Sequence, residues 1–221
     1  MMTSAGADDD PAGTASDGSS APNVVVAVLA RRAELGKGKR RLAVTLGDEA
    51  TLAVYRQLIA TCARAVADSG FPATVYFDPA PGDADVWPPE RFRYTVQPAV
   101  SDLGVRLHVA AADALSGGAA GVLLIGTDCP SITGQLLLTA ADALRTYDAV
   151  LGPSTDGGYY LLGFKRLEPA LFGDIAWSTE AVAEQTRAVL AKAGWRTLEV
   201  PALTDIDVEA DWRAYRDAHK G

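Results

Sequence analysis

The stretch GVLLIGTDCP, residues 121–130, decides the fold class of this chain. Four consecutive apolar residues, VLLI, run into Gly126, Thr127 and Asp128. An apolar run this short is typical of a buried strand in a parallel sheet, and open α/β sheets bind ligands just past the carboxyl ends of such strands. Asp128 is therefore the first candidate metal ligand, although an Asp at such a position is also a common turn or helix-cap residue.

Strands and helices alternate along the rest of the chain. Short apolar runs predict strands, and helical periodicity with caps and stops predicts the helices between them. The strands are expected at 23–30, 73–77, 121–126, 149–152, 159–164 and 197–200, and the helices at 48–69, 102–115, 133–145, 179–193 and from about 208. Such alternation predicts a single α/β domain over residues 23–221, with a mostly parallel sheet covered on both faces.

Two segments are expected to lie outside this alternation. Residues 1–22 lack large apolar side chains after Met2, so we expect a disordered tail. The stretch after residue 77 that contains Pro88 and Pro89 is interpreted as a proline-rich connection.

Composition narrows the possible partners and the location. The net charge of −8 argues against a general nucleic-acid binder, and no apolar run approaches the roughly 20 residues of a membrane helix. Cys62 and Cys129 are the only cysteines, so neither a disulfide framework nor a thiolate zinc site is indicated. We expect a soluble cytoplasmic protein with no nucleic-acid or membrane partner, and the sequence leaves its oligomeric state open.

A basic glycine-rich loop follows the first expected strand at residues 35–42, LGKGKRRL. Glycines let a backbone approach phosphate closely, and Lys and Arg donate charge-assisted hydrogen bonds to it. The loop is therefore a candidate polyphosphate clamp, although a run of charges is also commonly a solvated surface. The spacings of the P-loop and of the dinucleotide-binding fingerprint are both absent.

Two further acidic groups are candidates for chemistry. Asp156 lies in GPSTDGGYYLLG, residues 152–163, where it fits a hairpin turn, a ligand contact or both. Asp205 and Asp207 alternate with Ile206, which places both carboxylates on one side of an extended segment, where one of them could complete a divalent site with Asp128. Acidic residues at this position also suit the start of the following helix.

Nucleophilic catalysis of the protease type has little support. His108 and His219 are the only histidines, one inside a predicted helix and the other near the end of the chain, and the GxSxG motif is missing.

Six ordered segments resemble one family of small bacterial transferases. They are GKGKRRLA at 36–43, SDLGVRL at 101–107 together with Gln97, GTDCPSIT at 126–133, GPSTDGGYYLLGF at 152–164, IAWST at 175–179 and LTDIDVEAD at 203–211. The chain is similar in these segments to the family known as DUF2064, often labelled arsenosugar-biosynthesis or selenium-domain-associated glycosyltransferases. The resemblance covers residues 23–217 and implies the GT-A, or nucleotide-diphospho-sugar transferase, fold with three layers.

The resemblance also implies roles for individual residues. Lys39 and Arg41 correspond to the Lys and Arg that contact nucleotide phosphates, and Asp128 and Asp207 to ligands of Mg²⁺ or Mn²⁺. The implied catalytic residues are Asp128 and Asp156. The implied nucleotide-binding residues are Gly36, Lys37, Lys39, Arg40, Arg41 and Asp102, and the implied acceptor-binding residues are Gly157, Gly158, Tyr159, Trp177, Ser178 and Thr179.

Four positions depart from the family pattern. Arg40 replaces a Thr, Ser101 a Gly and Val105 a Glu, while Val208 replaces the Thr that usually caps the last helix. With Val208 unable to cap, Asp207 is expected to take over the capping, in competition with metal binding.

These inferences lead to one expected function and two alternatives. The first is a metal-dependent glycosyltransferase that uses a nucleoside-diphosphate sugar and a small-molecule acceptor. The second is a nucleotidyltransferase of the guanylyl- or cytidylyltransferase type that releases pyrophosphate from an NTP. The third is a nucleotide-binding module without catalytic activity.

Overall fold

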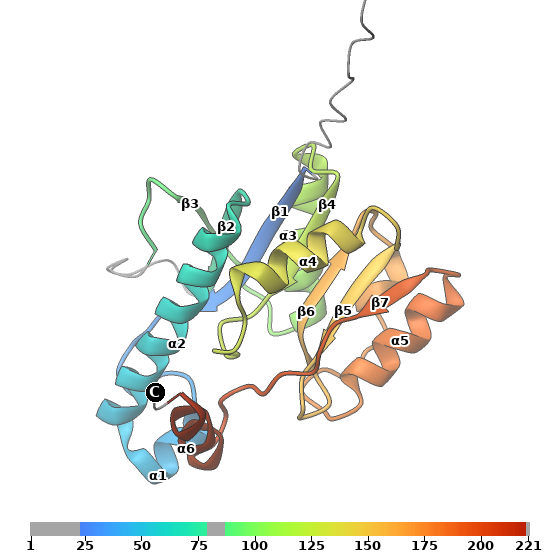
Figure 1. The fold of residues 1–221 in the computed structure, drawn as a ribbon. Helices are drawn as coiled ribbons and strands as arrows, with labels where there is room; N and C mark the ends of the chain where they lie inside the picture. The colour runs from blue at the N-terminus through green and yellow to red at the C-terminus, as the bar shows by residue number, and fades with distance from the viewer. Residues whose placement is uncertain (1–22, 79–86, 220–221) are drawn as a thin grey trace, which may run out of the picture.

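Seven strands form one sheet in the order β3-β2-β1-β4-β6-β5-β7 in the computed structural model, which describes residues 23–78 and 87–219 (Figure 1). The strands are β1 (Val24–Arg31), β2 (Ala73–Asp78), β3 (Phe92–Val96), β4 (Gly121–Ile125), β5 (Ala149–Pro153), β6 (Tyr159–Phe164) and β7 (Thr197–Glu199). Only β6 runs antiparallel to its neighbours, β4 and β5. The mostly parallel sheet that the sequence predicts is confirmed.

The carboxyl ends of the parallel strands meet at one edge of the sheet. From β1 the chain moves outward to β2 and β3 on one side, and then returns to place β4 on the other side of β1. A reversal of this kind opens a crevice between the two strands, which is where open α/β sheets bind their ligands. The segments that follow β1 and β4 therefore flank the expected ligand site.

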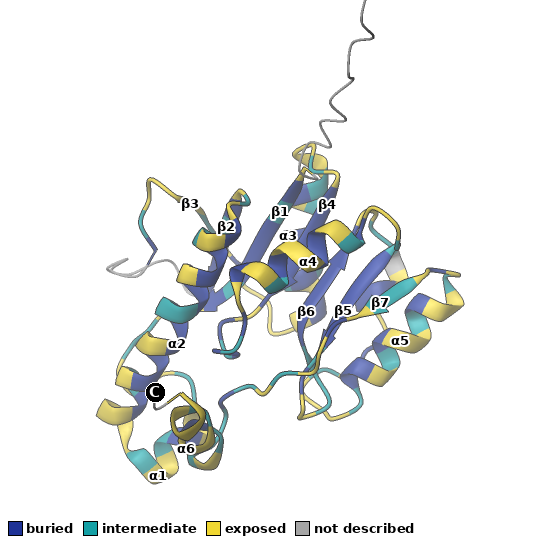
Figure 2. Cartoon of the chain, in the orientation of Figure 1, coloured by how far each residue is buried: buried dark blue, intermediate teal, exposed yellow. Residues whose placement is uncertain are grey.

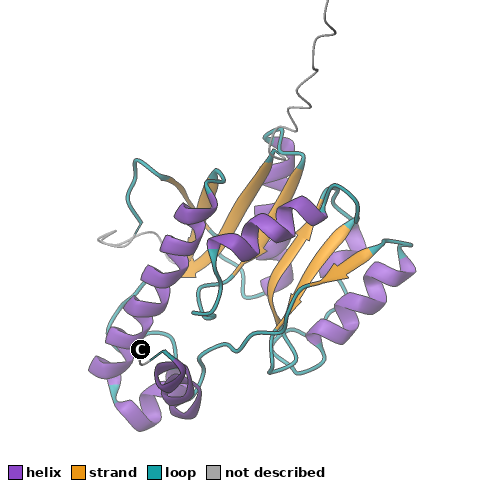
Figure 3. Cartoon of the chain, viewed as in Figure 1, coloured by secondary structure: helices purple, strands orange, loops and turns teal. Residues whose placement is uncertain are grey.

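Helices cover both faces of the sheet (Figure 3). The helices of the described residues are α1 (Arg40–Leu46), α2 (Asp48–Ser69), α3 (Leu103–Ser116), α4 (Gly134–Ala143), α5 (Val182–Lys192) and α6 (Glu209–Ala218), with a 3₁₀ turn η1 (Pro169–Phe172). Of these, α1 and α6 lie beyond the end of the sheet, near the start of α2 (Figure 1). Leu123 and Ile125 of β4 share a core with α2 and α4, whereas Val122 and Leu124 share the other core with α3 and α5. All of β4 is buried, which is why its sequence is apolar without alternation (Figure 2).

Several expected elements match the structure closely. The helix expected at 48–69 is α2, and the hairpin expected around Asp156 joins β5 to β6. The expected tail at residues 1–22 and part of the proline-rich connection lie outside the described residues. No helix in the described ranges has both the length and the apolar character that crossing a bilayer requires.

Three local expectations were wrong. The helix expected at 179–193 begins only at Val182, because Ser178 has a left-handed φ of 64° and Thr179 Oγ1 closes a turn by donating to Ala176 O and accepting from Ala181 N. Strand β3 was missed, and so was α1, whose first residues belong to the basic stretch interpreted as a loop.

Candidate active site

Lys39 joins segments that lie far apart in the sequence. It stands between β1 and α1, and its Nζ donates to Ile206 O at 2.6 Å and lies 3.0 Å from both Asp128 Oδ2 and Asp207 Oδ1. Its side chain is only 6% exposed. Burial lowers the pKa of Lys39, but the two carboxylates outweigh this and raise it above its ordinary value. Lys39 is therefore a charged group that holds Asp128 and Asp207 together.

Asp128 projects from the loop after β4, between the buried Thr127 and Cys129. The backbone N–H of Ile206 donates to the carbonyl of Asp128 at 2.9 Å, so the segment before α6 runs along this loop. Ile206 is buried in the core, while Asp205 and Asp207 on either side of it line one cavity, which is described below. The residue alternation predicts this arrangement.

Asp207 does not cap α6, and that expectation was wrong. Asp211 Oδ2 instead accepts from the backbone N–H groups of Asp207 and Val208 at 3.0 and 2.9 Å. The Asp207 carboxylate is thereby left for cations, with Oδ1 on Lys39 and Oδ2 3.5 Å from Arg41.

Asp205 carries an unusual carboxylate. Its Oδ1 atom is buried and finds no hydrogen-bond partner within the described residues. Burial raises the pKa of Asp205 to about 7, and the negative charges of Asp128 and Asp156 act in the same direction. An orphaned oxygen of this kind is available to a ligand that enters the cavity.

A cavity of about 1450 Å³ lies beside Asp128, Asp205 and Asp207, at the carboxyl edge of β4 and β5, and we call it the acidic cavity. Asp156 lies on its wall, in the turn between β5 and β6. Its Oδ1 accepts from Gly158 N at 3.0 Å and from the Ser154 hydroxyl. The side chain therefore shapes the turn and faces the cavity at the same time, so the structural and ligand-contact interpretations are compatible.

The segment before α5 forms an adjoining wall of the cavity and packs against the hairpin turn. Gly157 has a φ of +89°, and its carbonyl accepts from Ala183 N at 2.8 Å. A Cβ at Gly157 would lie 2.2 Å from Glu180 O, so only glycine fits here. Tyr159 and Trp177 line the cavity from the two walls, with their rings edge to face at a centroid separation of 6.3 Å.

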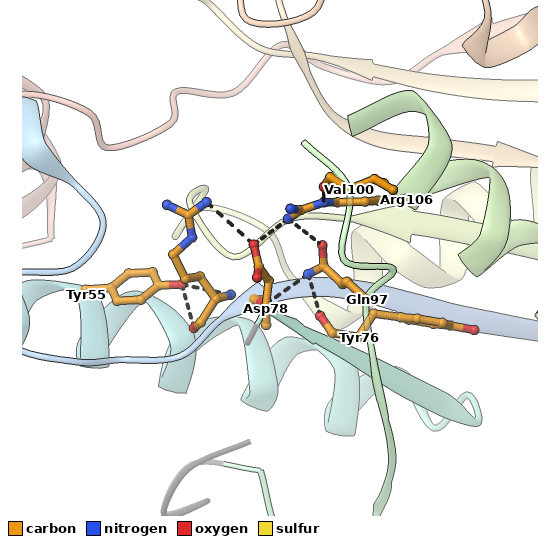
Figure 4. A network of polar contacts seen from close by, with 8 residues as sticks. Tyr55, Tyr76, Asp78, Gln97, Val100 and Arg106 are labelled. Atoms are coloured by element: carbon orange, nitrogen blue, oxygen red, sulfur yellow. Dashed lines mark hydrogen bonds and ion pairs between the residues drawn. The ribbon is translucent and has the colours of Figure 1, made fainter. Parts of the chain in front are cut away.

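The basic cavity is the name we give to a second space, of about 800 Å³, on the β1–β2 side of Lys39. Figure 4 shows the polar network on its wall, where Asp78 at the end of β2 accepts from Arg106 of α3 and lies 3.9 Å from Arg31 at the end of β1. Arg106 also donates to Val100 O at 2.7 Å and to Gln97 Oε1 at 3.2 Å. The network fixes the guanidinium group of Arg106 and places that of Arg31 near it, beside the crevice.

Most predicted site residues gather at these two cavities. The acidic cavity is lined by Arg41, Asp128, Asp156, Gly157, Gly158, Tyr159, Trp177, Ser178, Thr179 and Asp207, and the basic cavity by Lys39, Arg40, Arg41, Asp128, Ser178 and Asp207.

Three predicted nucleotide-binding residues stand apart from both cavities. Gly36 and Lys37 line a small separate pocket. Asp102 caps α3, where its Oδ1 accepts from Gly104 N at 2.7 Å and Val105 N at 3.3 Å. The structure gives Asp102 a structural task that needs no ligand.

Sequence reasoning missed four charged residues that line the cavities, Arg31, Asp78, Arg106 and Glu180. Asp78 is the last residue of a largely buried strand, at the same edge of the sheet as Asp128, so the same argument could have found it. Arg106 and Glu180 carry no local signal, because they reach the site through the packing of α3 and of the segment before α5.

The acidic side chains near Lys39 can supply only some of the ligands that a divalent cation needs. Within residues 23–78 and 87–219, no group of three His, Cys, Asp or Glu side chains is arranged to hold a metal ion. Mg²⁺ commonly takes one or two carboxylates and completes its shell with phosphate oxygens and water. Asp128, Asp207 and the orphaned Asp205 oxygen fit an ion that binds together with a phosphate ligand.

Two solved structures with similar folds carry the names of transferases. A structure from Desulfovibrio desulfuricans G20, provisionally assigned as a nucleotide-diphospho-sugar transferase, has a TM-score of 0.82 and 28% identity, and the match covers 90% of this chain and 89% of that one. A nucleotidyl transferase from Methanothermobacter thermautotroptrophicus has a TM-score of 0.55 and 16% identity, with coverage of 87% and 96%. The chain thus has the nucleotide-diphospho-sugar transferase fold and stands among transferases.

Family membership follows from the sequence itself. The profile of DUF2064, described as an uncharacterized protein conserved in bacteria, matches residues 60–179, more than half of the chain, and the chain belongs to this family. Rv0371c from Mycobacterium tuberculosis H37Rv, solved in complex with manganese, shares the fold at a TM-score of 0.51 and 19% identity, over 88% of this chain and 98% of that one. Among curated proteins, none matches the sequence.

Proposed function

We propose that this protein is a metal-dependent glycosyltransferase that moves a glycosyl group from a nucleoside-diphosphate sugar to a small-molecule acceptor. The supporting observation is the convergence of Lys39, Asp128 and Asp207 within 3.0 Å, where the basic and acidic cavities meet. The similarity to the protein from Desulfovibrio desulfuricans, assigned as a nucleotide-diphospho-sugar transferase, supports the same class of donor.

The basic cavity would hold the diphosphate. Lys39, Arg40 and Arg41 line it, and the guanidinium and ammonium groups of such residues donate charge-assisted hydrogen bonds to phosphate oxygens. In this structure the Lys39 ammonium group is paired with the carboxylates of Asp128 and Asp207. A divalent cation bound to those carboxylates would free Lys39 to bind an incoming phosphate. The same residues would then stabilise the negative charge that develops on the diphosphate leaving group.

Asp128 and Asp207 would hold a divalent cation, Mg²⁺ or Mn²⁺, with Asp205 as an additional donor. When bound, such an ion supplies positive charge to the phosphates and fixes their orientation. The manganese complex of the structurally similar Rv0371c supports this choice of cofactor.

Asp156 would orient the acceptor. Its Oδ1 is used by the turn, so Oδ2 is the oxygen left over for an acceptor hydroxyl or amine, whose proton it could receive. Gly157, Gly158, Tyr159, Trp177, Ser178 and Thr179 would surround that acceptor.

A second candidate is a nucleotidyltransferase that releases pyrophosphate from an NTP. Five cationic residues line the basic cavity, and a triphosphate needs more positive charge than a diphosphate. This count is the observation in its favour.

Product analysis separates the candidates. The protein is incubated with Mg²⁺ or Mn²⁺, with NDP-sugars or NTPs, and with the small-molecule fraction of a bacterial extract as the acceptor source. Release of NDP supports the glycosyltransferase, and release of pyrophosphate supports the nucleotidyltransferase. Nucleotide binding with neither product, or a fully active Asp128→Ala variant, would contradict both catalytic proposals.

A further inference from the structure

The two cavities carry opposite charges although they adjoin. Both are lined by Arg41, Asp128 and Asp207. The charged residues that line only the basic cavity are Arg31, Lys39, Arg40, Arg106 and Asp78. The charged residues that line only the acidic cavity are Asp156, Glu180 and Asp205, and all three are acids. Charge therefore separates the phosphate side from the acceptor side.

Asp156 and Glu180 are held together by the backbone. The turn that carries Asp156 is bound to the first turn of α5, which directly follows the segment of Glu180, through the hydrogen bond from Ala183 N to Gly157 O at 2.8 Å. The close approach of Gly157 to Glu180 permits no side chain at residue 157. The fold thus fixes the backbone positions of residues 156 and 180 next to each other, and both residues line the acidic cavity.

Aromatic side chains lie beside these acids. Tyr159 and Trp177 line the acidic cavity with their rings at an interplanar angle of 74°, and Leu103, Leu107 and Val182 add apolar surface. The Tyr159 hydroxyl is buried without a hydrogen-bond partner in the described part of the chain. Aromatic faces combined with carboxylates attract organic cations, because the ring quadrupole and the carboxylate charge act in the same direction.

We propose that the acceptor in the acidic cavity is a small molecule with a cationic group, such as an amine or another onium group, attached to an apolar body. This inference rests on the proposed transferase function and names its acceptor class. A phosphorylated or carboxylated acceptor would face Asp156, Glu180 and Asp205, and among the described residues of this cavity it would meet a single cationic side chain, Arg41, which the two cavities share.

Three probes that share a phenylethyl body and differ only in the terminal group test the proposal. They are phenethylamine, which is cationic, 2-phenylethanol, which is neutral, and 2-phenylethyl phosphate, which is anionic. Their affinities are measured by calorimetry on the full chain, with and without a nucleoside diphosphate and Mg²⁺. We expect the amine to bind best and the phosphate at least about tenfold more weakly than the amine. A phosphate probe that binds as well as the amine, or failure of all three probes to bind, would overturn the proposal.

Variants locate the effect. The double variant Asp156→Asn/Glu180→Gln should lose most of the preference for the amine, while Glu184→Gln, an exposed acid of α5 outside both cavities, should keep it. Thermal melting checks that each variant is folded. An unchanged preference in the double variant contradicts the inference.

Nucleotide binding in the same samples tests the proposed function separately. If the nucleotide binds and the phosphate probe is preferred, only the acceptor assignment fails. If the amine is preferred but no nucleoside diphosphate or triphosphate binds, the proposed function fails while the charge preference of the cavity stands.

Discussion

Replacement of Lys39 by methionine should weaken both the fold and the binding of nucleotide. The ammonium group has three acceptors at 2.6–3.0 Å, and a hydrogen bond to a charged group contributes about 1.5–3 kcal/mol. Two effects reduce the net loss. The variant no longer has to desolvate an ammonium group, and the Asp128 and Asp207 side chains, 45% and 38% exposed, can be hydrated by water. We expect a net loss of about 2 kcal/mol, or roughly 4–8 °C in melting temperature.

Lys37→Met is the matched control. Lys37 is an exposed lysine two positions earlier on the same loop, outside both cavities, and its replacement should change the stability by less than about 0.5 kcal/mol. Addition of Asp207→Asn to Lys39→Met should recover part of the loss, because it removes one of the two carboxylates left without their cation.

Thermal and urea melts of the four proteins, followed by nucleotide titrations, provide the assay. The reasoning is refuted if Lys39→Met melts together with Lys37→Met and binds nucleotide as tightly as the unmodified chain.

Other parts of the structure give further predictions. Gly157→Ala should cost at least about 2 kcal/mol because its Cβ would meet backbone, whereas Gly70→Ala, also at positive φ but with open space around it, should cost about 1 kcal/mol; equal melting temperatures would contradict the close contact. Asp102→Ala should lose about 1 kcal/mol of cap energy and Asp102→Asn almost none, with nucleotide affinity unchanged in both; weaker binding by Asp102→Asn would instead indicate a nucleotide contact. Burial raises the pKa of Cys62 and of Cys129 to about 12, so iodoacetamide at about pH 8 should label them slowly in the native protein and rapidly in guanidinium, and rapid native labelling would disprove their burial.

Much of the fold is predictable from the sequence because burial leaves a strong local pattern. Strand β4 is buried on both faces and reads as an uninterrupted apolar run, and α2 has clear stops at both ends. Strand β3 is an edge strand in which only Phe92 is buried, so its sequence shows no apolar alternation. Helix α1 is too short, with only Leu42 buried, to show helical periodicity.

The residues of the candidate site also divide into those that the sequence predicts and those that it does not. The basic loop, Asp128 and the pair Asp205 and Asp207 could be brought together by reasoning because each lies near a strand or helix end, whereas the family resemblance singled out Lys39 and Asp207. The position of Glu180 depends on a backbone contact between the hairpin turn and the segment before α5. A contact of this kind produces no recognisable spacing of residues in the sequence. The strained φ of Ser178 likewise emerges only from packing.

The account depends most on nucleotide phosphates binding at Asp128 together with a divalent cation. Thermal melting of the unmodified chain and of Asp128→Ala, with a panel of NDPs and NTPs in Mg²⁺, Mn²⁺ or EDTA, tests this directly. A ligand at 100 times its Kd adds about 2.7 kcal/mol, or roughly 5–11 °C here. We predict such a rise for at least one nucleotide with metal, and its loss in EDTA and in Asp128→Ala. The account would be contradicted by no rise with any nucleotide. It would also be contradicted by an equal rise for the unmodified chain with metal, for the unmodified chain in EDTA and for Asp128→Ala.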